Sequence, residues 1–245
     1  MKIADGVHLI ASGSLGVSLT SPYDCNAFAV RCGDRYWLID AGVGQGTERI
    51  IEELERDGVS DRKIGGLLLT HYHLDHAGGA AWMQRNLGMP VMAGQETARV
   101  LQAGDEEAIS LPAGREAGVY PKEFKFEACP VGRILVSGKK LLFGDTEVEA
   151  IHTPGHSKDM MAYVFRQRGR TLLFPGDTVF YGGRIALQAT HDCDTRAYAE
   201  SLRVLAGLSY DMIFPGHGLW SLQDAQRHVD AAMTYVDRLL LPPNL

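Results

Sequence analysis

The chain has 245 residues, of which 45% are hydrophobic and 22% are charged. These values are ordinary for a folded globular protein and exclude a disordered chain, a collagen-like chain and a coiled-coil rod. The net charge of −6 provides no overall positive field that would attract nucleic acid or an anionic membrane surface.

The cysteines and the apolar runs exclude further classes of protein. The four cysteines include no CxxC pair, which argues against a disulfide framework and a thiolate zinc site. Apolar runs such as residues 65–70 are far shorter than the roughly 20 residues of a membrane-spanning helix, and Asp5 and His8 interrupt any signal-peptide core. We expect one cytoplasmic domain over residues 1–245, acting on a small molecule without nucleic acid or membrane partners. A homo-oligomer is left open.

Short apolar runs that end at Gly, Pro, His or Asp predict a mixed α/β fold. In the first half they predict a hairpin at 26–39, helices at 47–57 and 79–86, and strands at 64–69 and 91–92. In the second half they predict a hairpin at 141–151, strands at 171–174 and 212–214, a helix capped by Asp194, and a last helix from about 221 to 240.

The stretch from about 101 to 140 fits this pattern poorly. It combines acidic residues, prolines and scattered aromatic residues. We expect an inserted segment that packs on the domain. Long segments of this kind are either lids over a site or plain surface excursions, and the sequence leaves both open.

Three histidines and one aspartate follow the predicted strand at 64–69. They are His71, His73, Asp75 and His76. In extended backbone His71 and His73 point to the same side, and the chain then turns. Imidazole and carboxylate groups bind zinc, iron and manganese. Because so many buried polar groups would be costly without a metal, the motif predicts a metal site.

Three later strands each end in a Pro-Gly turn that a potential ligand follows. These ligands are His156, Asp177 and His217. Pro and Gly form tight turns, so the repeated pattern predicts that the three side chains share one sheet edge. Seven ligands exceed the needs of one tetrahedral zinc ion and suit two metal ions with open positions for water.

This ordered set of residues resembles the metallo-β-lactamase-fold hydrolases over most of the chain. The resemblance implies a four-layer αβ/βα sandwich with two divalent metal ions at one rim, most often zinc, with iron or manganese as alternatives. It implies one metal on His71, His73 and His156, a second on Asp75, His76 and His217, and a bridge through Asp177. Asp40 matches the family's acidic residue on an early strand, which supports the ligands by hydrogen bonding.

The implied reaction is attack by a metal-bridging hydroxide on a carbonyl carbon or a phosphorus. We expect Asp75 to orient the hydroxide and to carry a proton to the leaving group. We hypothesise that Tyr181 donates a hydrogen bond to the substrate oxygen. An ordinary aromatic residue of the pocket wall is the alternative for Tyr181.

The resemblance narrows the reaction more than the substrate. Thioesterases of the glyoxalase II kind share the signatures at 152–156 and 175–178, and lactonases of this fold share the ligands. We therefore expect a dinuclear hydrolase of an ester, thioester or lactone. A mononuclear iron persulfide dioxygenase of the same fold, and hydrolysis of a phosphodiester or β-lactam, are the alternatives.

Overall fold

Two mixed β-sheets, each with its own helices, organise the chain. The computed structural model describes residues 1–245 and divides into unit 1, Met1–Ile134, and unit 2, Leu135–Leu245. The helices of both units are too short or too polar to cross a membrane.

The sheet of unit 1 has seven strands whose order in space follows the sequence. The strands are β1 (Lys2–Ala4), β2 (Val7–Ala11), β3 (Ala27–Cys32), β4 (Arg35–Ile39), β5 (Ile64–Leu68), β6 (Val91–Ala93) and β7 (Arg133–Ile134). Neighbours are antiparallel from β1 to β4 and parallel from β4 to β7. The carboxyl ends of β4 and β5 therefore meet at one edge, where Asp40 and His71 follow.

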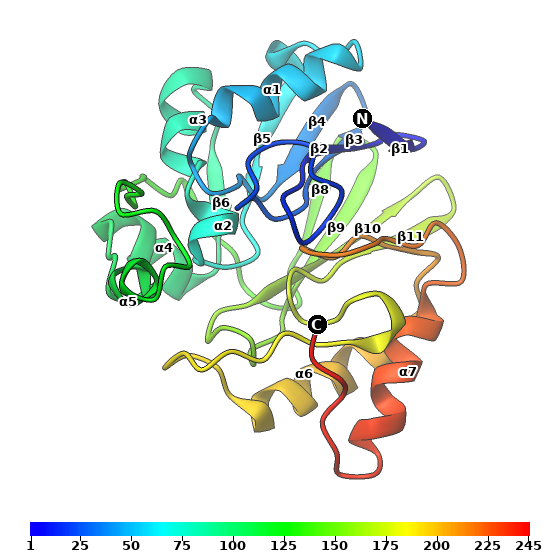
Figure 1. Ribbon diagram of the computed structural model, residues 1–245. Helices are drawn as coiled ribbons and strands as arrows, with labels where there is room; N and C mark the ends of the chain where they lie inside the picture. The colour runs from blue at the N-terminus through cyan, green and yellow to red at the C-terminus, as the bar shows by residue number, and fades with distance from the viewer. The chain divides into compact units, whose positions relative to one another are not determined.

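Helices of unit 1 bury one face in the core of this unit. They are α1 (Thr47–Arg56), the 3-10 turn η1 (Asp61–Lys63), α2 (Leu74–Ala77), α3 (Ala80–Leu87), α4 (Gln95–Ala103) and α5 (Leu111–Glu116). Ile50 and Leu54 of α1 share a hydrophobic cluster with Leu67 of β5, and α1 and α3 lie against the sheet (Figure 1). The helices predicted at 47–57 and 79–86 are confirmed to within a residue at most ends.

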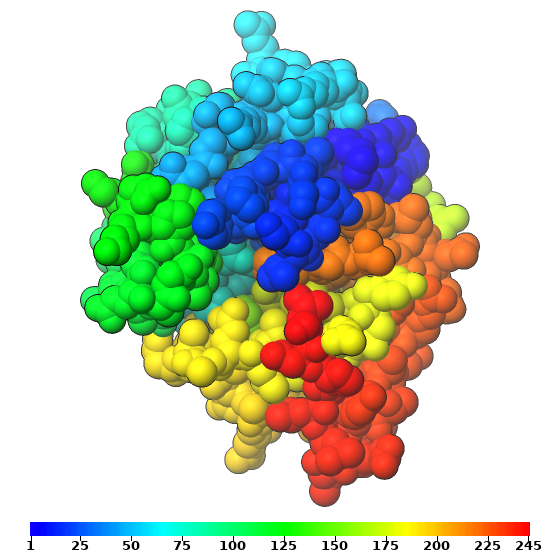
Figure 2. Space-filling view, in the orientation of Figure 1, coloured from blue at the N-terminus to red at the C-terminus, as the bar shows by residue number.

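The segment predicted as an insertion is built into unit 1 as far as Ile134. It contains the end of α4, all of α5 and the edge strand β7. Phe124 and Phe126 are buried in the core of unit 1, and the Phe124 ring lies 5.1 Å from that of Tyr23. Residues around α5 are visible at the surface in green (Figure 2). Whether this stretch is an insertion, and whether it acts as a lid, both stay predictions.

The sheet of unit 2 has five strands in the order β12-β11-β10-β9-β8. The strands are β8 (Lys140–Phe143), β9 (Thr146–His152), β10 (Met161–Gln167), β11 (Arg170–Phe174) and β12 (Met212–Ile213). The sequence analysis did not predict β10, whose first five residues are all buried and show no alternation. Since β10 is antiparallel to β9 and β11, and β12 is parallel to β11, the three strands with Pro-Gly turns end at one edge.

Two helices and one short turn complete unit 2. They are η2 (Tyr181–Gly183), α6 (Thr195–Ala206) and α7 (Gln226–Val236). Asp194 caps α6 as predicted, because its carboxylate accepts the backbone N–H of Arg196 at 2.8 Å and that of Ala197 at 3.0 Å. Helices α6 and α7 pack side by side (Figure 1).

The last helix is shorter than predicted. It begins at Gln226, because the backbone of Ser221 instead pairs with Ile213 of the neighbouring strand through two hydrogen bonds of 3.0 Å. Leu222 and Leu240, near the two ends of the predicted range, are 40% and 51% exposed. The apolar spacing thus extended beyond the residues that this helix buries.

Candidate metal centre

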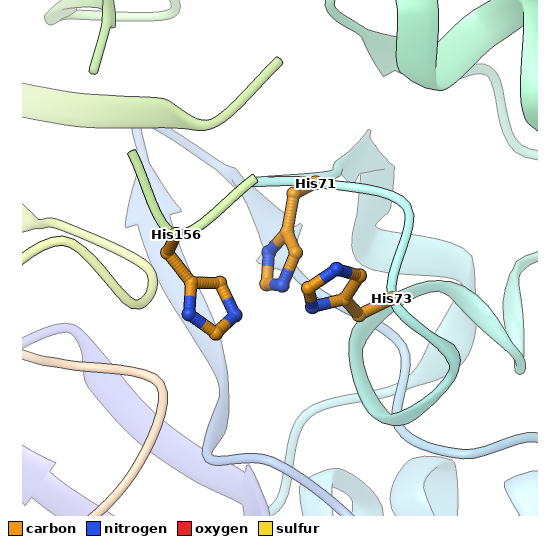
Figure 3. A group of neighbouring side chains, drawn as sticks. All are labelled: His71, His73 and His156. Atoms are coloured by element: carbon orange, nitrogen blue, oxygen red, sulfur yellow. The ribbon is translucent and has the colours of Figure 1, made fainter. Parts of the chain in front are cut away.

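The ligand candidates of unit 1 lie at the carboxyl end of β5. His71 and His73 stand in the loop after the strand, and Asp75 and His76 are on the short helix α2. His71 and His76 are fully buried, and His73 is 8% exposed. The ring centroid of His71 lies 4.5 Å from that of His73 and 4.1 Å from that of His76. The rings of His71 and His73 are drawn in Figure 3. The loop and α2 thus bring three imidazoles together away from water.

This donor set fits a divalent metal ion. Three buried imidazoles at such distances cannot all be protonated, since their charges would repel one another in a site without water. Neutral rings present lone pairs, and the carboxylate of Asp75 adds a charged oxygen 3.5 Å from Nε2 of His76. Lone pairs of neutral imidazole together with carboxylate oxygen are the ligands that zinc and related ions take.

Asp40 directs these rings from the end of β4. Its carboxylate lies 2.8 Å from Nδ1 of His76 and accepts the hydroxyl of Thr70 at 2.8 Å. The Thr70 oxygen in turn lies 3.0 Å from Nδ1 of His71. With its Nδ1 proton donated to Asp40, His76 has its lone pair on Nε2, and the same tautomer of His71 satisfies the hydroxyl of Thr70.

Asp40 adopts this position at a conformational cost. Its φ of 62° lies in the left-handed region, which aspartate enters more readily than most residues. The Thr70 backbone N–H donates to the Asp40 carboxylate at 2.8 Å, and the Asp40 N–H donates to the carbonyl of Leu68 at 2.9 Å. These bonds hold the strained residue in place, a pattern that is common at functional sites.

Cys25 lies beside Asp40 and His76 and was not predicted from the sequence as part of the site. Its sulfur, an oxygen of Asp40 and a nitrogen of His76 lie within 4.8 Å of one another. Complete burial raises the pKa of Cys25 to about 12. Without a bound metal ion the thiol therefore stays protonated at neutral pH.

The ligand candidates of unit 2 meet around one carboxylate. Oδ2 of Asp177 lies 3.6 Å from Nε2 of His156 and 3.2 Å from Nε2 of His217. All three side chains are less than 10% exposed. Nδ1 of His156, labelled in Figure 3, lies 2.8 Å from the carbonyl oxygen of Ala186, which holds the proton on Nδ1 and the lone pair on Nε2.

Tyr198 of α6 braces two of these ligands and was not predicted to do so. Its hydroxyl donates to the backbone carbonyl of Asp177 and accepts the backbone N–H of Ala186 at 3.1 Å. Burial raises the pKa of Tyr198 well above its usual value, so the phenol stays neutral and can donate. The sequence shows this tyrosine only as an apolar position on the buried face of a helix.

Tyr181, the predicted hydrogen-bond donor, begins η2 four residues after Asp177 and is 41% exposed. Its ring centroid lies 4.4 Å from that of His228, and the guanidinium of Arg227 lies 6.0 Å from its ring centre. His228 accepts the backbone N–H of Gly182 at 3.0 Å. The tyrosine is therefore packed on one side and open to solvent on the other.

The remaining histidines have other surroundings. His8 lies 2.6 Å from the carboxylate of Asp57, and His152 lies 3.1 Å from the carbonyl oxygen of Lys158. His191 is exposed. Unit 1 therefore brings together His71, His73, Asp75 and His76, and unit 2 brings together His156, Asp177 and His217.

Comparison with known proteins places the chain in a family. The family model of the metallo-beta-lactamase superfamily matches residues 20–217, a range that includes every ligand candidate of both units. A subclass B3 metallo-beta-lactamase of Bradyrhizobium japonicum has a similar structure, with a TM-score of 0.70 at 20% identity over 90% of this chain and 88% of the other. The α/β fold class expected from the resemblance is confirmed.

Two relatives are thioesterases by name. An atrochrysone carboxyl ACP thioesterase of Aspergillus fumigatus is 27% identical over 79% of this chain, which spans only 50% of that protein's length. An acyl-coenzyme A thioesterase of Gallus gallus is 26% identical over 87% of this chain and 78% of its own length. From the family match, the fold and the buried His/Asp clusters, the chain belongs to the metallo-beta-lactamase superfamily of metal-dependent hydrolases.

Proposed function

We propose that the protein is a metal-dependent hydrolase of carbonyl esters, with thioesters as its substrate class and zinc as its metal. In this proposal the ligand candidates of both units hold two divalent ions together. They are His71, His73, Asp75, His76, His156, Asp177 and His217. The family match, which includes all seven, and their chemistry as oxygen and nitrogen donors support the proposal.

The observation that carries this proposal is the direction of the imidazole protons. Nδ1 of His76 faces the Asp40 carboxylate, and Nδ1 of His156 faces the Ala186 carbonyl. Each ring is thereby turned so that its Nε2 atom lies within 3.6 Å of a carboxylate oxygen. Imidazole and carboxylate donors that converge in this way, with the other ring nitrogen held by a hydrogen bond, are typical of metal ligands.

The chain's own residues then have separate tasks. A pair of bound divalent ions supplies positive charge that polarises a carbonyl group and acidifies water. Asp177 lies between two imidazoles, which suits a bridging carboxylate. Asp75, which is 17% exposed and lies beside His76, would hold a water proton and pass it to the leaving group. Tyr181 would donate its hydroxyl proton to the substrate carbonyl oxygen.

A thioester is favoured over an oxygen ester or a lactone because two relatives are named thioesterases. Their names give different thiol carriers, an acyl carrier protein and coenzyme A. Both names describe release of an acid from a thiol. Oxygen esters and lactones are the alternative substrates with which the thioesters are to be compared.

Metal content and a substrate panel test the proposal together. The purified protein is analysed for metals and then assayed with an acyl-coenzyme A, lactoyl-glutathione, an acyl-homoserine lactone, an aryl phosphodiester and a chromogenic cephalosporin. We expect two equivalents of zinc and the highest kcat/KM on a thioester. One equivalent of iron with oxygen uptake on a persulfide would instead establish the dioxygenase alternative.

Alanine variants distinguish metal ligands from residues that do not bind the metal. We expect His73→Ala and Asp177→Ala to lose metal and activity together while the circular dichroism spectrum stays that of a folded protein. His152→Ala is the control, because His152 is exposed and contacts a backbone carbonyl. Full turnover in a metal-depleted sample would contradict the proposal.

A further inference from the structure

A basic hollow lies at the hairpin end of the sheet in unit 1. Its volume is about 420 Å³. Six residues line it: Arg31, Asp34, Arg35, Tyr36, Arg62 and Lys63. Four of these side chains are cationic and one is acidic, which leaves a formal surplus of three positive charges in a chain whose net charge is −6.

Strand register brings these residues to one place. Arg31 pairs with Tyr36 across the β3–β4 hairpin, and Tyr36 in turn pairs with Ile64 at the start of β5. Arg62 and Lys63 belong to η1 and immediately precede Ile64. Ser60 caps this turn by accepting the backbone N–H of Arg62 at 3.3 Å. The basic side chains therefore project from backbone that paired strands and a capped turn hold in position.

The cations of the hollow are not neutralised by the protein. Arg99, Arg115 and Arg166 each have a carboxylate oxygen within 2.8 Å. The four basic side chains of the hollow form no ion pair, and Arg31 uses its Nε–H on the carbonyl of Gly33 at 3.0 Å. The carboxylate of Asp61 is directed to the backbone N–H of Arg62 at 2.6 Å. A surplus of three positive charges in one place is unfavourable, and a bound anion would relieve the repulsion.

The hollow is remote from the ligand candidates of unit 1. Strands β4 and β5 begin beside it and end next to Asp40 and Thr70. Five extended residues span roughly 16 Å, so the hollow and these ligands lie at opposite ends of the same strands. An anion in the hollow would not be the group that the proposed metal ions act upon.

We propose that this hollow binds an anion with two or more phosphate groups, either inorganic or the phosphate chain of a nucleotide. A guanidinium group matches two phosphate oxygens at once, and three arginines with one lysine suit a chain of phosphates better than a single charge. Tyr36, which is half-buried, lines the same hollow.

Isothermal titration calorimetry with pyrophosphate tests the proposal on the intact protein by measuring the heat of binding. We expect saturable binding that weakens as salt rises. The double variant Arg35→Gln with Arg62→Gln should bind about tenfold more weakly or worse, because it loses two charge-assisted contacts. Asp34→Asn should bind more tightly, because it removes the acidic group from the lining. Arg99→Gln, at an exposed arginine of α4, should bind as the wild type does.

Further arms identify the ligand and its location. Retained pyrophosphate binding in His73→Ala assigns the binding to the hollow, and its loss there overturns the proposal. ADP binding tighter than pyrophosphate identifies a nucleotide, and equal affinity identifies the inorganic chain. Citrate binding as tight as pyrophosphate, absent binding, or equal affinity in wild type and the double variant would each overturn it. Lys63→Gln, a single exposed change, serves if the double variant does not fold. None of these outcomes depends on hydrolytic activity.

Discussion

Asp40 and His76 are 36 residues apart in sequence, yet a carboxylate oxygen of Asp40 lies 2.8 Å from Nδ1 of His76. Both side chains are buried, and the same carboxylate accepts the hydroxyl of Thr70. One acidic residue at the end of β4 therefore orients imidazoles that follow β5, and it does so behind the face that would receive a metal ion.

Replacing Asp40 with Asn should weaken metal binding without unfolding the protein. The amide keeps the size of the side chain but loses its charge, and only one of its two terminal atoms can accept a hydrogen bond, whereas both oxygens of Asp40 accept one. We expect zinc affinity to fall about 10- to 100-fold, the usual cost of removing such a partner. Competition with a zinc chelator measures the change. Asp230→Asn on the exposed side of α7 is the control, and an unchanged affinity for Asp40→Asn would show that the orientation of His76 does not matter.

Removing the hydroxyl of Tyr198 should destabilise unit 2. Tyr198→Phe leaves the Asp177 carbonyl and the Ala186 N–H without this partner in a buried site. We expect the free energy of unfolding to fall by about 1–3 kcal/mol, together with a lower zinc affinity. Urea titration measures the first effect. Tyr235→Phe, at a partly exposed tyrosine of α7, should change neither quantity; equal behaviour of the two variants would remove the bracing role.

Gly155 should not tolerate a side chain. Its φ is +144°, and a Cβ there would lie 2.5 Å from Cα of Tyr198. Gly58 has a φ of +79° but open space around it. It therefore separates the cost of backbone strain from the cost of the steric clash. We expect Gly58→Ala to cost about 1 kcal/mol from backbone strain alone. Gly155→Ala should cost at least about 2 kcal/mol more, because helix α6 must move. Similar unfolding midpoints for both variants would contradict the close contact.

His228 should make the protein less stable in mild acid. Burial, and then the charge of Arg227, lower the pKa of His228 below 6.5. As pH falls below 6.5, the unfolded chain binds a proton that the folded chain does not, so the stability present at neutral pH is lost. His228→Asn keeps an acceptor for the Gly182 N–H but cannot titrate. Its unfolding free energy should therefore fall less between pH 7 and pH 5 in urea titrations. Parallel curves for variant and wild type would exclude His228 as the cause.

Much of the fold and of the ligand set could be predicted because the relevant signals are local. The six residues from His71 to His76 carry their chemistry in their spacing, and each Pro-Gly turn marks the exit of a strand beside its ligand. The cap at Asp194 likewise acts within a few residues.

Only the tertiary structure decided which groups hold the ligands in position. The partners of His76 and His156 lie 36 and 30 residues away, and the Tyr198 hydroxyl reaches the Asp177 carbonyl across 21 residues. No local pattern encodes such a contact, because a helical face that buries Tyr198 looks the same whether its hydroxyl supports a ligand or an ordinary loop. The sequence by itself determined which side chains can bind a metal. The packing of strands and helices determined the proton positions that make their nitrogens available.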